Sequence, residues 1–190
     1  MVACAIDDNV QNHQLMLLHG AQGKGKSTFI RHLLPPELKD YYRNGMIIPE
    51  NNNHLLQLSS CLLINLDEFD TLSPERMQNL KSLITQDVVN ERKVYDIQNY
   101  TYIRRASFIA STNNPHCMPD VKENRRILFS TLLNIDYHTP VNHEGIYAQA
   151  YALYRQGFQY WYENEEITFL NNRNEAFRQK DPIEENLFFY

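Results

Sequence analysis

The chain has 190 residues, of which 43% are hydrophobic and 22% are charged, and its formal net charge is −5. This length suits one domain with a substantial core, and the ordinary composition argues against a disordered chain. No apolar stretch of 18 residues is present, and the first residues lack the charged and apolar regions of a secretory signal. Three cysteines without metal-ligand spacing fit a reduced protein, so we expect a cytoplasmic location without membrane attachment.

The charge is unevenly distributed along the chain. Residues 81–130 hold eight Lys and Arg against five Asp and Glu, so this segment has a net charge of +3 and the remainder −8. A basic segment within an acidic protein is compatible with a local surface for phosphate or nucleic acid.

The segment 15–30, LMLLHGAQGKGKSTFI, contains the strongest motif. Four apolar residues predict a buried strand, a glycine-rich turn follows, and a helix is expected from Ser27 to about Leu34, before two prolines. This is G-x-x-x-x-G-K-S in its strand–loop–helix context, so we expect ATP to bind through Lys26 at the β- and γ-phosphates and Mg²⁺ to bind the Ser27 hydroxyl. The expected nucleotide-binding residues are Gly20, Gln22, Gly23, Lys24, Gly25, Lys26, Ser27 and Thr28.

Two further predicted strands end in polar residues. The apolar run 61–66 precedes Asp67 and Glu68 and resembles a Walker B strand, in which Asp67 would hold Mg²⁺ and Glu68 would activate the attacking water. An ordinary strand followed by an acidic turn is the simpler alternative. Residues 107–112 predict another buried strand, after which Asn113 is placed to sense the γ-phosphate as sensor 1, with Asn114 one position away as the alternative.

Two basic segments suggest further contacts. Arg125 and Arg126 precede an apolar run at 127–135, the expected last strand, and suit an arginine finger acting in a neighbouring subunit; a pair of surface arginines is the alternative. Residues 92–106 predict a hairpin that could grip single-stranded DNA, although a hairpin with a solvated charged face fits equally well. The expected DNA contacts are Lys93, Tyr102, Arg104 and Arg105.

The C-terminal part of the sequence predicts helices. Two helical segments are expected on either side of Gly157, and the aromatic run 158–162 is expected to pack them onto the sheet. We therefore divide the chain into an ATPase core at 1–140 and a helical extension at 141–190.

The motifs GAQGKGKSTFIRHLLP, LINLDEFD, SFIASTNN and ENRRILF, with the basic hairpin and YALYRQGFQYWYENEEI, together resemble the virulence-associated E family. This family is similar to superfamily 3 helicases. The resemblance implies an α/β P-loop fold of AAA+ type with a mostly parallel sheet in the order 5-1-4-3-2, a homo-oligomer such as a hexameric ring, and a role in replication of phage or mobile DNA. It also implies an upstream primase-like domain. Because this chain begins shortly before the first predicted strand, we expect that domain to be missing, which places unwinding by this segment alone in doubt.

We therefore predict an ATP- and Mg²⁺-dependent motor domain that acts on single-stranded DNA. A small-molecule or nucleoside kinase would also need the glycine-rich loop, but not the acidic pair Asp67-Glu68. A nucleotide-gated binding module that does not unwind DNA remains a second alternative.

Overall fold

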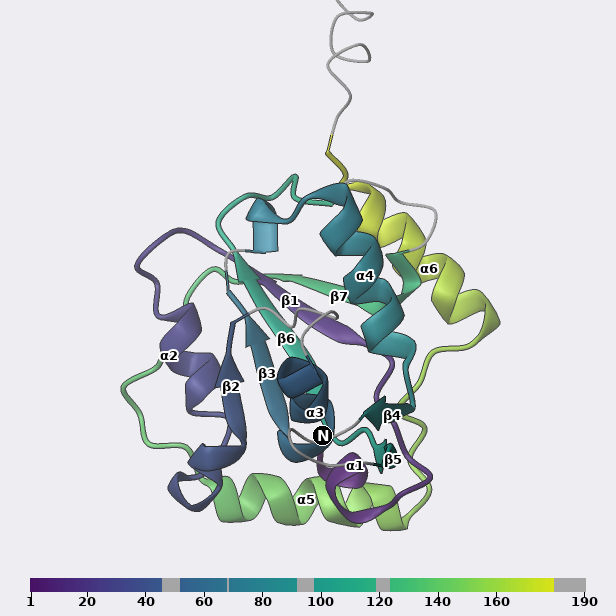
Figure 1. Ribbon diagram of the computed structural model, residues 1–190. Coiled ribbons are helices and arrows are strands. Elements are labelled where there is room, and N and C mark those ends of the chain that lie inside the picture. The colour runs from purple at the N-terminus through teal and green to yellow at the C-terminus, as the bar shows by residue number, and fades with distance from the viewer. Residues whose placement is uncertain (46–51, 68, 92–97, 119–123, 180–190) are drawn as a thin grey trace, which may run out of the picture.

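The computed structural model describes residues 1–45, 52–67, 69–91, 98–118 and 124–179, and a five-stranded sheet is its central element (Figure 1). The strands are β1 (Leu15–His19), β2 (Tyr42–Asn44), β3 (Leu63–Leu66), β6 (Ser107–Thr112) and β7 (Ile127–Thr131). They lie in the order β2-β3-β6-β1-β7, and all neighbouring pairs are parallel. When these five strands alone are numbered 1 to 5 along the chain and read from β7, the order is the expected 5-1-4-3-2.

Helices and a separate hairpin surround this sheet (Figure 1). The helices are α1 (Val2–Ile6), α2 (Lys26–Arg31), α3 (Asn52–Ser60), α4 (Pro74–Thr85), α5 (His143–Arg155) and α6 (Asn164–Glu175), with short 3-10 helices η1 (Pro36–Tyr41), η2 (Phe69–Thr71) and η3 (Asn124–Arg126). Strands β4 (Val88–Glu91) and β5 (Tyr100–Ile103) pair antiparallel as the hairpin. Among the described residues, no helix combines the length and apolar character that a membrane span requires.

Both faces of the central sheet contribute residues to the core, although Met16 of β1 is 41% exposed. Leu15 and Leu17 of β1 belong to a core cluster that also contains residues of α3 and α4. Leu18 of β1 lies in a second cluster with Ile109 of β6 and Ile30 of α2. Because successive side chains of a strand point to opposite faces, helices on both sides require a continuous apolar run, and this is what residues 15–18 provide.

Strand β7 is an edge strand and is shorter than the sequence predicts. Its last residue, Thr131, pairs with His19, the last residue of β1, so the apolar run to residue 135 has no partner strand beyond that point. Helix α6 covers the start of this edge, where the buried Asn174 donates its side-chain amide to the Ile127 carbonyl at 2.8 Å. An edge strand leaves backbone groups unpaired, and this bond satisfies one of them.

The aromatic run between α5 and α6 differs from our expectation. Phe158, Tyr160, Trp161 and Tyr162 are 57%, 42%, 48% and 41% exposed, so they do not pack the two helices onto the sheet. Helix α6 is held instead by the buried Leu170 in its middle and by Phe177, just after the helix, whose ring stacks on Phe129 of β7.

Candidate functional site

The glycine-rich loop connects β1 to α2 and lies at the carboxyl edge of the sheet. Gly23 and Gly25 have φ values of +76° and +83°, a left-handed conformation that glycine adopts without steric cost. At Gly25 there is a second constraint, because a Cβ atom would lie 2.1 Å from Cδ1 of Tyr137. The loop therefore curls back on itself with an aromatic ring against its last glycine.

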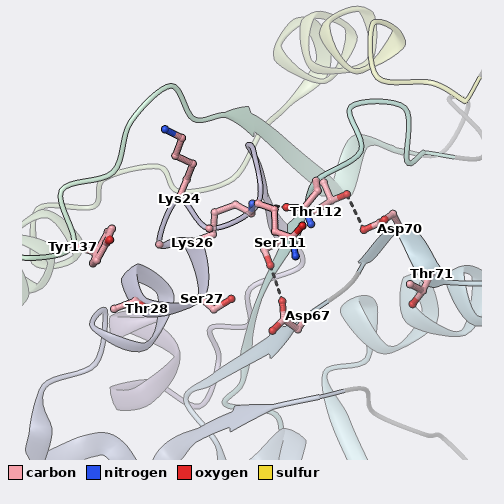
Figure 2. A pocket seen from close by; sticks show the side chains of 14 residues that line it. Lys24, Lys26, Ser27, Thr28, Asp67, Asp70, Thr71, Ser111, Thr112 and Tyr137 are labelled. Carbon is pink, nitrogen blue, oxygen red and sulfur yellow. Dashed lines mark hydrogen bonds between the residues drawn. The ribbon is translucent and has the colours of Figure 1, made fainter.

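A cavity of about 590 Å³ opens beside this loop (Figure 2). The size lies within the usual range of roughly 300–1,000 Å³ for small-molecule sites. Four parts of the chain line it: the loop and the start of α2, the segment after β3, the end of β6 and the segment after β7. The lining residues are Gln22, Gly23, Lys24, Gly25, Lys26, Ser27, Thr28, Asp67, Asp70, Thr71, Ser111, Thr112, Asn113 and Tyr137.

Lys26 is the central cation of the cavity. It is only 8% exposed, and its Nζ donates hydrogen bonds to the carbonyls of Gly20 at 2.6 Å and Ala21 at 3.0 Å. A third bond reaches Oδ1 of Asn113 at 2.7 Å. Burial lowers the pKa of Lys26, while the negative charge of Asp67 and Asp70 opposes this decrease. The ammonium is thus held in place by oxygen atoms of the loop and of the end of β6.

Two carboxylates line the opposite side of the cavity, and each is fixed by a hydroxyl group of β6. Ser111 Oγ donates to Asp67 Oδ1 at 2.8 Å, and Thr112 Oγ1 donates to Asp70 Oδ1 at 3.0 Å (Figure 2). Asp67 is half-buried and Asp70 is exposed. Glu68 lies outside the described residues, so the structure does not place its side chain.

The structure separates the two neighbouring asparagines. Asn113 accepts from Lys26, whereas Oδ1 of Asn114 accepts from the backbone N–H of His116 at 2.9 Å. The backbone N–H of Asn114 also donates to Thr112 Oγ1 at 3.0 Å. Asn113 therefore faces the cavity, and Asn114 stabilises the turn that follows β6.

Several cavity residues have no role in the sequence-based prediction. Ser111 and Thr112 occupy the end of a predicted strand beside Asn113, and that position is the signal that would have found them. Asp70 follows the acidic pair, but nothing in its local sequence distinguishes it from a solvated turn residue. Tyr137 lies after the last strand, and only the tertiary structure brings it to the loop.

The arginine pair lies at the amino end of the parallel strands, whereas the cavity lies at their carboxyl end. Arg125 and Arg126 belong to η3, which directly precedes β7, whereas the glycine-rich loop follows the carboxyl end of β1. Because β1 and β7 are parallel, the two features lie at opposite ends of neighbouring strands. The arginines do not belong to this chain's own cavity.

The hairpin supplies a correction to the expected DNA contacts. Arg104 is 1% exposed, and its guanidinium donates to the carbonyls of Leu83 and Asn12. Burial lowers the pKa of Arg104 to about 10. Arg105 forms an ion pair with Asp8 and also donates to a backbone carbonyl. The burial of Arg104 does not fit its assignment as a DNA contact, whereas Arg105 is half-buried with an exposed ion-pair partner and its assignment stays a prediction.

The two remaining residues of that prediction have different outcomes. Tyr102 of β5 is partly buried and packs against the core cluster, which leaves little of its ring for a base. Lys93 lies outside the described residues. The paired strands themselves are residues 88–91 and 100–103, so the hairpin begins earlier along the chain than the predicted 92–106.

Comparisons with known proteins identify a family and several similar solved structures. The virulence-associated protein E-like domain model matches residues 1–179, and no curated protein matches the chain. Among solved structures, an A-form apo structure of the NrS-1 C-terminal region is similar with a TM-score of 0.48 and 16% identity, over 88% of this chain and 34% of that one. A second A-form structure of that region has a TM-score of 0.47 and 18% identity, over 89% of this chain and 36% of that one. Another apo structure has a TM-score of 0.48 and 17% identity, over 88% of this chain and 36% of that one.

The chain spans about a third of the length of these structures, and the family assignment rests on the domain match alone. That match covers all of the described sheet, the glycine-rich loop and both C-terminal helices. The chain belongs to the virulence-associated protein E-like domain family.

Proposed function

We propose that this chain is an ATP-hydrolysing, helicase-like motor domain of a protein that replicates phage or mobile DNA. The observation that carries the proposal is the 2.7 Å hydrogen bond between Lys26 Nζ and Asn113 Oδ1. It joins the lysine of a nucleotide-binding motif to the amide expected to contact the γ-phosphate, in one cavity with Ser27 and Asp67. Family membership supports the same function.

Phosphate binding is the first task of the cavity. The curled loop directs backbone N–H groups toward an anion, and the Lys26 ammonium neutralises the β- and γ-phosphates. The carbonyls of Gly20 and Ala21 already orient that ammonium toward the cavity. Arrival of the γ-phosphate would replace part of this internal hydrogen bonding with stronger bonds to charged oxygens.

The residues present fit Mg²⁺, which prefers oxygen ligands and binds few protein groups beside the nucleotide phosphates. The Ser27 hydroxyl and the Asp67 carboxylate line the same cavity, and the bond from Ser111 fixes the carboxylate. When bound, Mg²⁺ would supply positive charge that offsets the negative charge developing on the transferred phosphoryl group. Ser27 and Asp67 are the residues that would hold it.

The attacking water needs a base and an orienting group. Glu68 directly follows Asp67 at the carboxyl end of β3, and we assign it the polarisation of that water on its position in the sequence. Asn113 has an amide that contacts Lys26 through its oxygen and keeps its NH₂ group as a donor for the γ-phosphate or the water.

The arginine finger belongs to the assembled protein in this proposal. Arg125 and Arg126 lie at the opposite end of the sheet from their own glycine-rich loop, so either can reach a nucleotide only in a neighbouring subunit. A homo-oligomer, such as a hexameric ring in the full-length protein, would supply that neighbour.

The test is steady-state phosphate release from MgATP, measured together with ATP affinity. We expect Lys26→Ala to weaken ATP binding, and Glu68→Gln to retain affinity within a few fold while release falls by at least about 10²-fold. Lys39→Ala is the matched control, because Lys39 is exposed on η1 away from the cavity.

The measured binding and turnover distinguish an ATPase from a nucleotide-gated binding module. A wild-type chain that binds no nucleotide would refute the proposal. Binding followed by negligible turnover, even at high protein concentration, would support the nucleotide-gated module instead. Turnover in Glu68→Gln at the wild-type rate would show that another group activates the water.

A further inference from the structure

A group of aromatic side chains lies exposed near the amino end of strand β7. Tyr160, Trp161 and Tyr162 are each between 41% and 48% exposed, although residues of this kind usually bury most of their surface. They line a cleft of about 270 Å³ together with Arg125 and Arg126. Tyr, Trp and Arg are enriched in protein–protein interfaces and contribute most of their binding energy. We call these five residues the aromatic end of the chain.

The charges around the aromatic end have both signs. The Glu163 carboxylate accepts from the indole N–H of Trp161 at 2.5 Å and keeps its negative charge. Glu165 and Glu166 follow in the first turn of α6. These carboxylates accompany the arginine pair, so the surface suits a protein partner with complementary charges better than it suits a polyanion.

A second exposed apolar feature lies beyond the carboxyl end of β7. Leu133 is 92% exposed. The residue before it, Leu132, donates its backbone N–H to the His19 carbonyl at 2.8 Å. The Leu132 carbonyl oxygen would also lie 3.2 Å from a Cβ added at Gly20, the first glycine of the loop. Leu133 is therefore held beside the glycine-rich loop, at the rim of the nucleotide cavity.

The loop adds a cation to the same rim. Lys24 is exposed, and Figure 2 shows its side chain pointing away from Asp67 and Asp70. Those two carboxylates line the cavity itself. The rim thus presents an apolar side chain and an ammonium at its surface, with negative charge deeper inside.

We propose that the aromatic end of one copy of this chain binds the cavity rim of a second copy. Leu133 of the second copy would pack among Tyr160, Trp161 and Tyr162, and Lys24 of the second copy would lie against the carboxylates at the start of α6. The choice of a second copy rests on the proposed function, in which the arginine pair acts on a neighbouring subunit's nucleotide. The aromatic residues share a cleft with those arginines, so they would lie in the same contact.

The proposed contact joins two different surfaces, so it is heterologous. Each copy offers one aromatic end and one rim, and copies therefore join head to tail. Such a contact closes into a ring when the rotation between neighbours permits it. It also predicts that a copy with a damaged rim can still bind a copy with a damaged aromatic end.

The chain contains its own probe, because Trp161 is its single tryptophan and lies in the proposed contact. We would follow its emission and the sedimentation of the chain, without nucleotide, as protein concentration increases. Association should bury the indole and shift its emission to shorter wavelength as larger species form. A chain that stays monomeric up to about 1 mM, the dissociation constant of a very weak complex, would overturn the proposal.

Leu133→Asp tests whether the rim of another copy covers the indole. Leu133 and Trp161 lie at opposite ends of β7, so within one copy the substitution does not touch the indole. We expect association to weaken at least about tenfold and the emission shift to disappear, whereas Leu133→Met should associate like wild type. Tyr41→Asp adds the same charge at a 46% exposed position beside β2, the opposite edge strand, and should leave association unchanged. Unchanged thermal unfolding of each variant would exclude loss of the fold.

A pair of complementary variants tests the head-to-tail arrangement. Leu133→Asp damages the rim, and the combination of Tyr160→Ala, Trp161→Ala and Tyr162→Ala damages the aromatic end. Each variant alone should remain monomeric, whereas an equimolar mixture should form a complex of one copy of each. The emission of the Leu133→Asp chain, which carries the only tryptophan of the mixture, should then shift. Self-association of Leu133→Asp, or a mixture that stays monomeric, would overturn the proposal.

A charge exchange tests the position of Lys24. Lys24→Glu should weaken association, because its carboxylate would face the acidic start of α6 in the next copy. Glu165→Lys in the same chain should restore part of the lost affinity. Failure of the second substitution to restore any affinity would overturn the placement of Lys24 against α6.

Failure of this proposal is distinguishable from failure of the ATPase proposal. Lys26→Ala should lose ATP binding but associate and shift its emission like wild type. Association by a wild-type chain that binds no nucleotide would support the interface while it refutes the nucleotide site. A wild-type chain that hydrolyses ATP at full rate as a monomer would overturn the interface and leave the nucleotide site in place.

Discussion

Replacing Gly25 by alanine tests the packing that shapes the nucleotide cavity. Gly25 lies at φ +83°, and an added Cβ would stand 2.1 Å, 2.4 Å and 2.8 Å from three ring carbons of Tyr137. Two penalties follow. The left-handed conformation costs a residue with a Cβ about 1–2 kcal/mol. Displacing the ring adds an overpacking cost of about 1–3 kcal/mol.

The expected loss of unfolding free energy for Gly25→Ala is therefore about 2–5 kcal/mol. For a chain of this size each kcal/mol lowers the melting temperature by about 2–4 °C. Removing the ring first separates the two costs, because in a Tyr137→Ala background only the conformational cost remains. The same alanine substitution should then cost about 1–2 kcal/mol.

The assay is chemical denaturation of four proteins: wild type, each single variant and the double variant. The coupling free energy between the two positions should be about 1–3 kcal/mol. Gly23→Ala is the matched control, because Gly23 also has a positive φ but nothing lies within 4 Å of its added Cβ. Equal costs for Gly25→Ala in both backgrounds would refute the packing argument.

Three further variants test other features of the structure. Asn113→Ala removes the oxygen that accepts from Lys26, so we expect phosphate release to fall about 10²-fold with ATP affinity within a few fold of wild type; unchanged release would exclude a role in turnover. Arg104→Ala leaves two carbonyls without donors and opens a cavity, so denaturation should show a loss of about 2–4 kcal/mol, against less than about 0.5 kcal/mol for the exposed Arg125→Ala. Burial raises the pKa of Cys117 to about 11, so above about pH 8.5 the thiol ionises in the unfolded chain before it ionises in the folded one. The free energy of unfolding of wild type should therefore fall with rising pH relative to that of Cys117→Ala. Parallel stability curves of the two proteins from pH 8 to 10 would contradict this.

Much of the central sheet is predictable because its strands are local, apolar segments. The predicted strand at residues 107–112 agrees with β6 at both ends, since burial on both faces leaves a continuous run with clear limits. Strand β7 ends four residues before its apolar run, and this limit depends on where β1 stops. Its physical cause lies in another strand more than a hundred residues away, which local sequence cannot reveal.

The candidate site residues also fall into those that local sequence predicts and those that depend on distant contacts. The glycine-rich loop and Asp67 are predictable because each follows directly from a strand whose end defines one edge of the sheet. Arg104 is different, because its burial is set by carbonyls 21 and 92 residues away along the chain. A basic side chain beside tyrosines has the same local pattern whether it faces solvent or the core. The same limit applies to Arg125 and Trp161, which meet in one cleft only through the tertiary fold.

Strand β7 connects the nucleotide cavity to the arginine pair at the opposite end of the sheet. Arg125 and Arg126 directly precede it, and the segment after it carries Tyr137 into the nucleotide cavity. Its five residues span about 17 Å at roughly 3.3 Å each, and they pair with β1 along their whole length. The two ends are therefore joined by one continuous, hydrogen-bonded strand. If a neighbouring subunit that contacts the arginines changes nucleotide affinity, thermodynamic linkage requires nucleotide to change the affinity of that contact by the same factor, so either titration measures both.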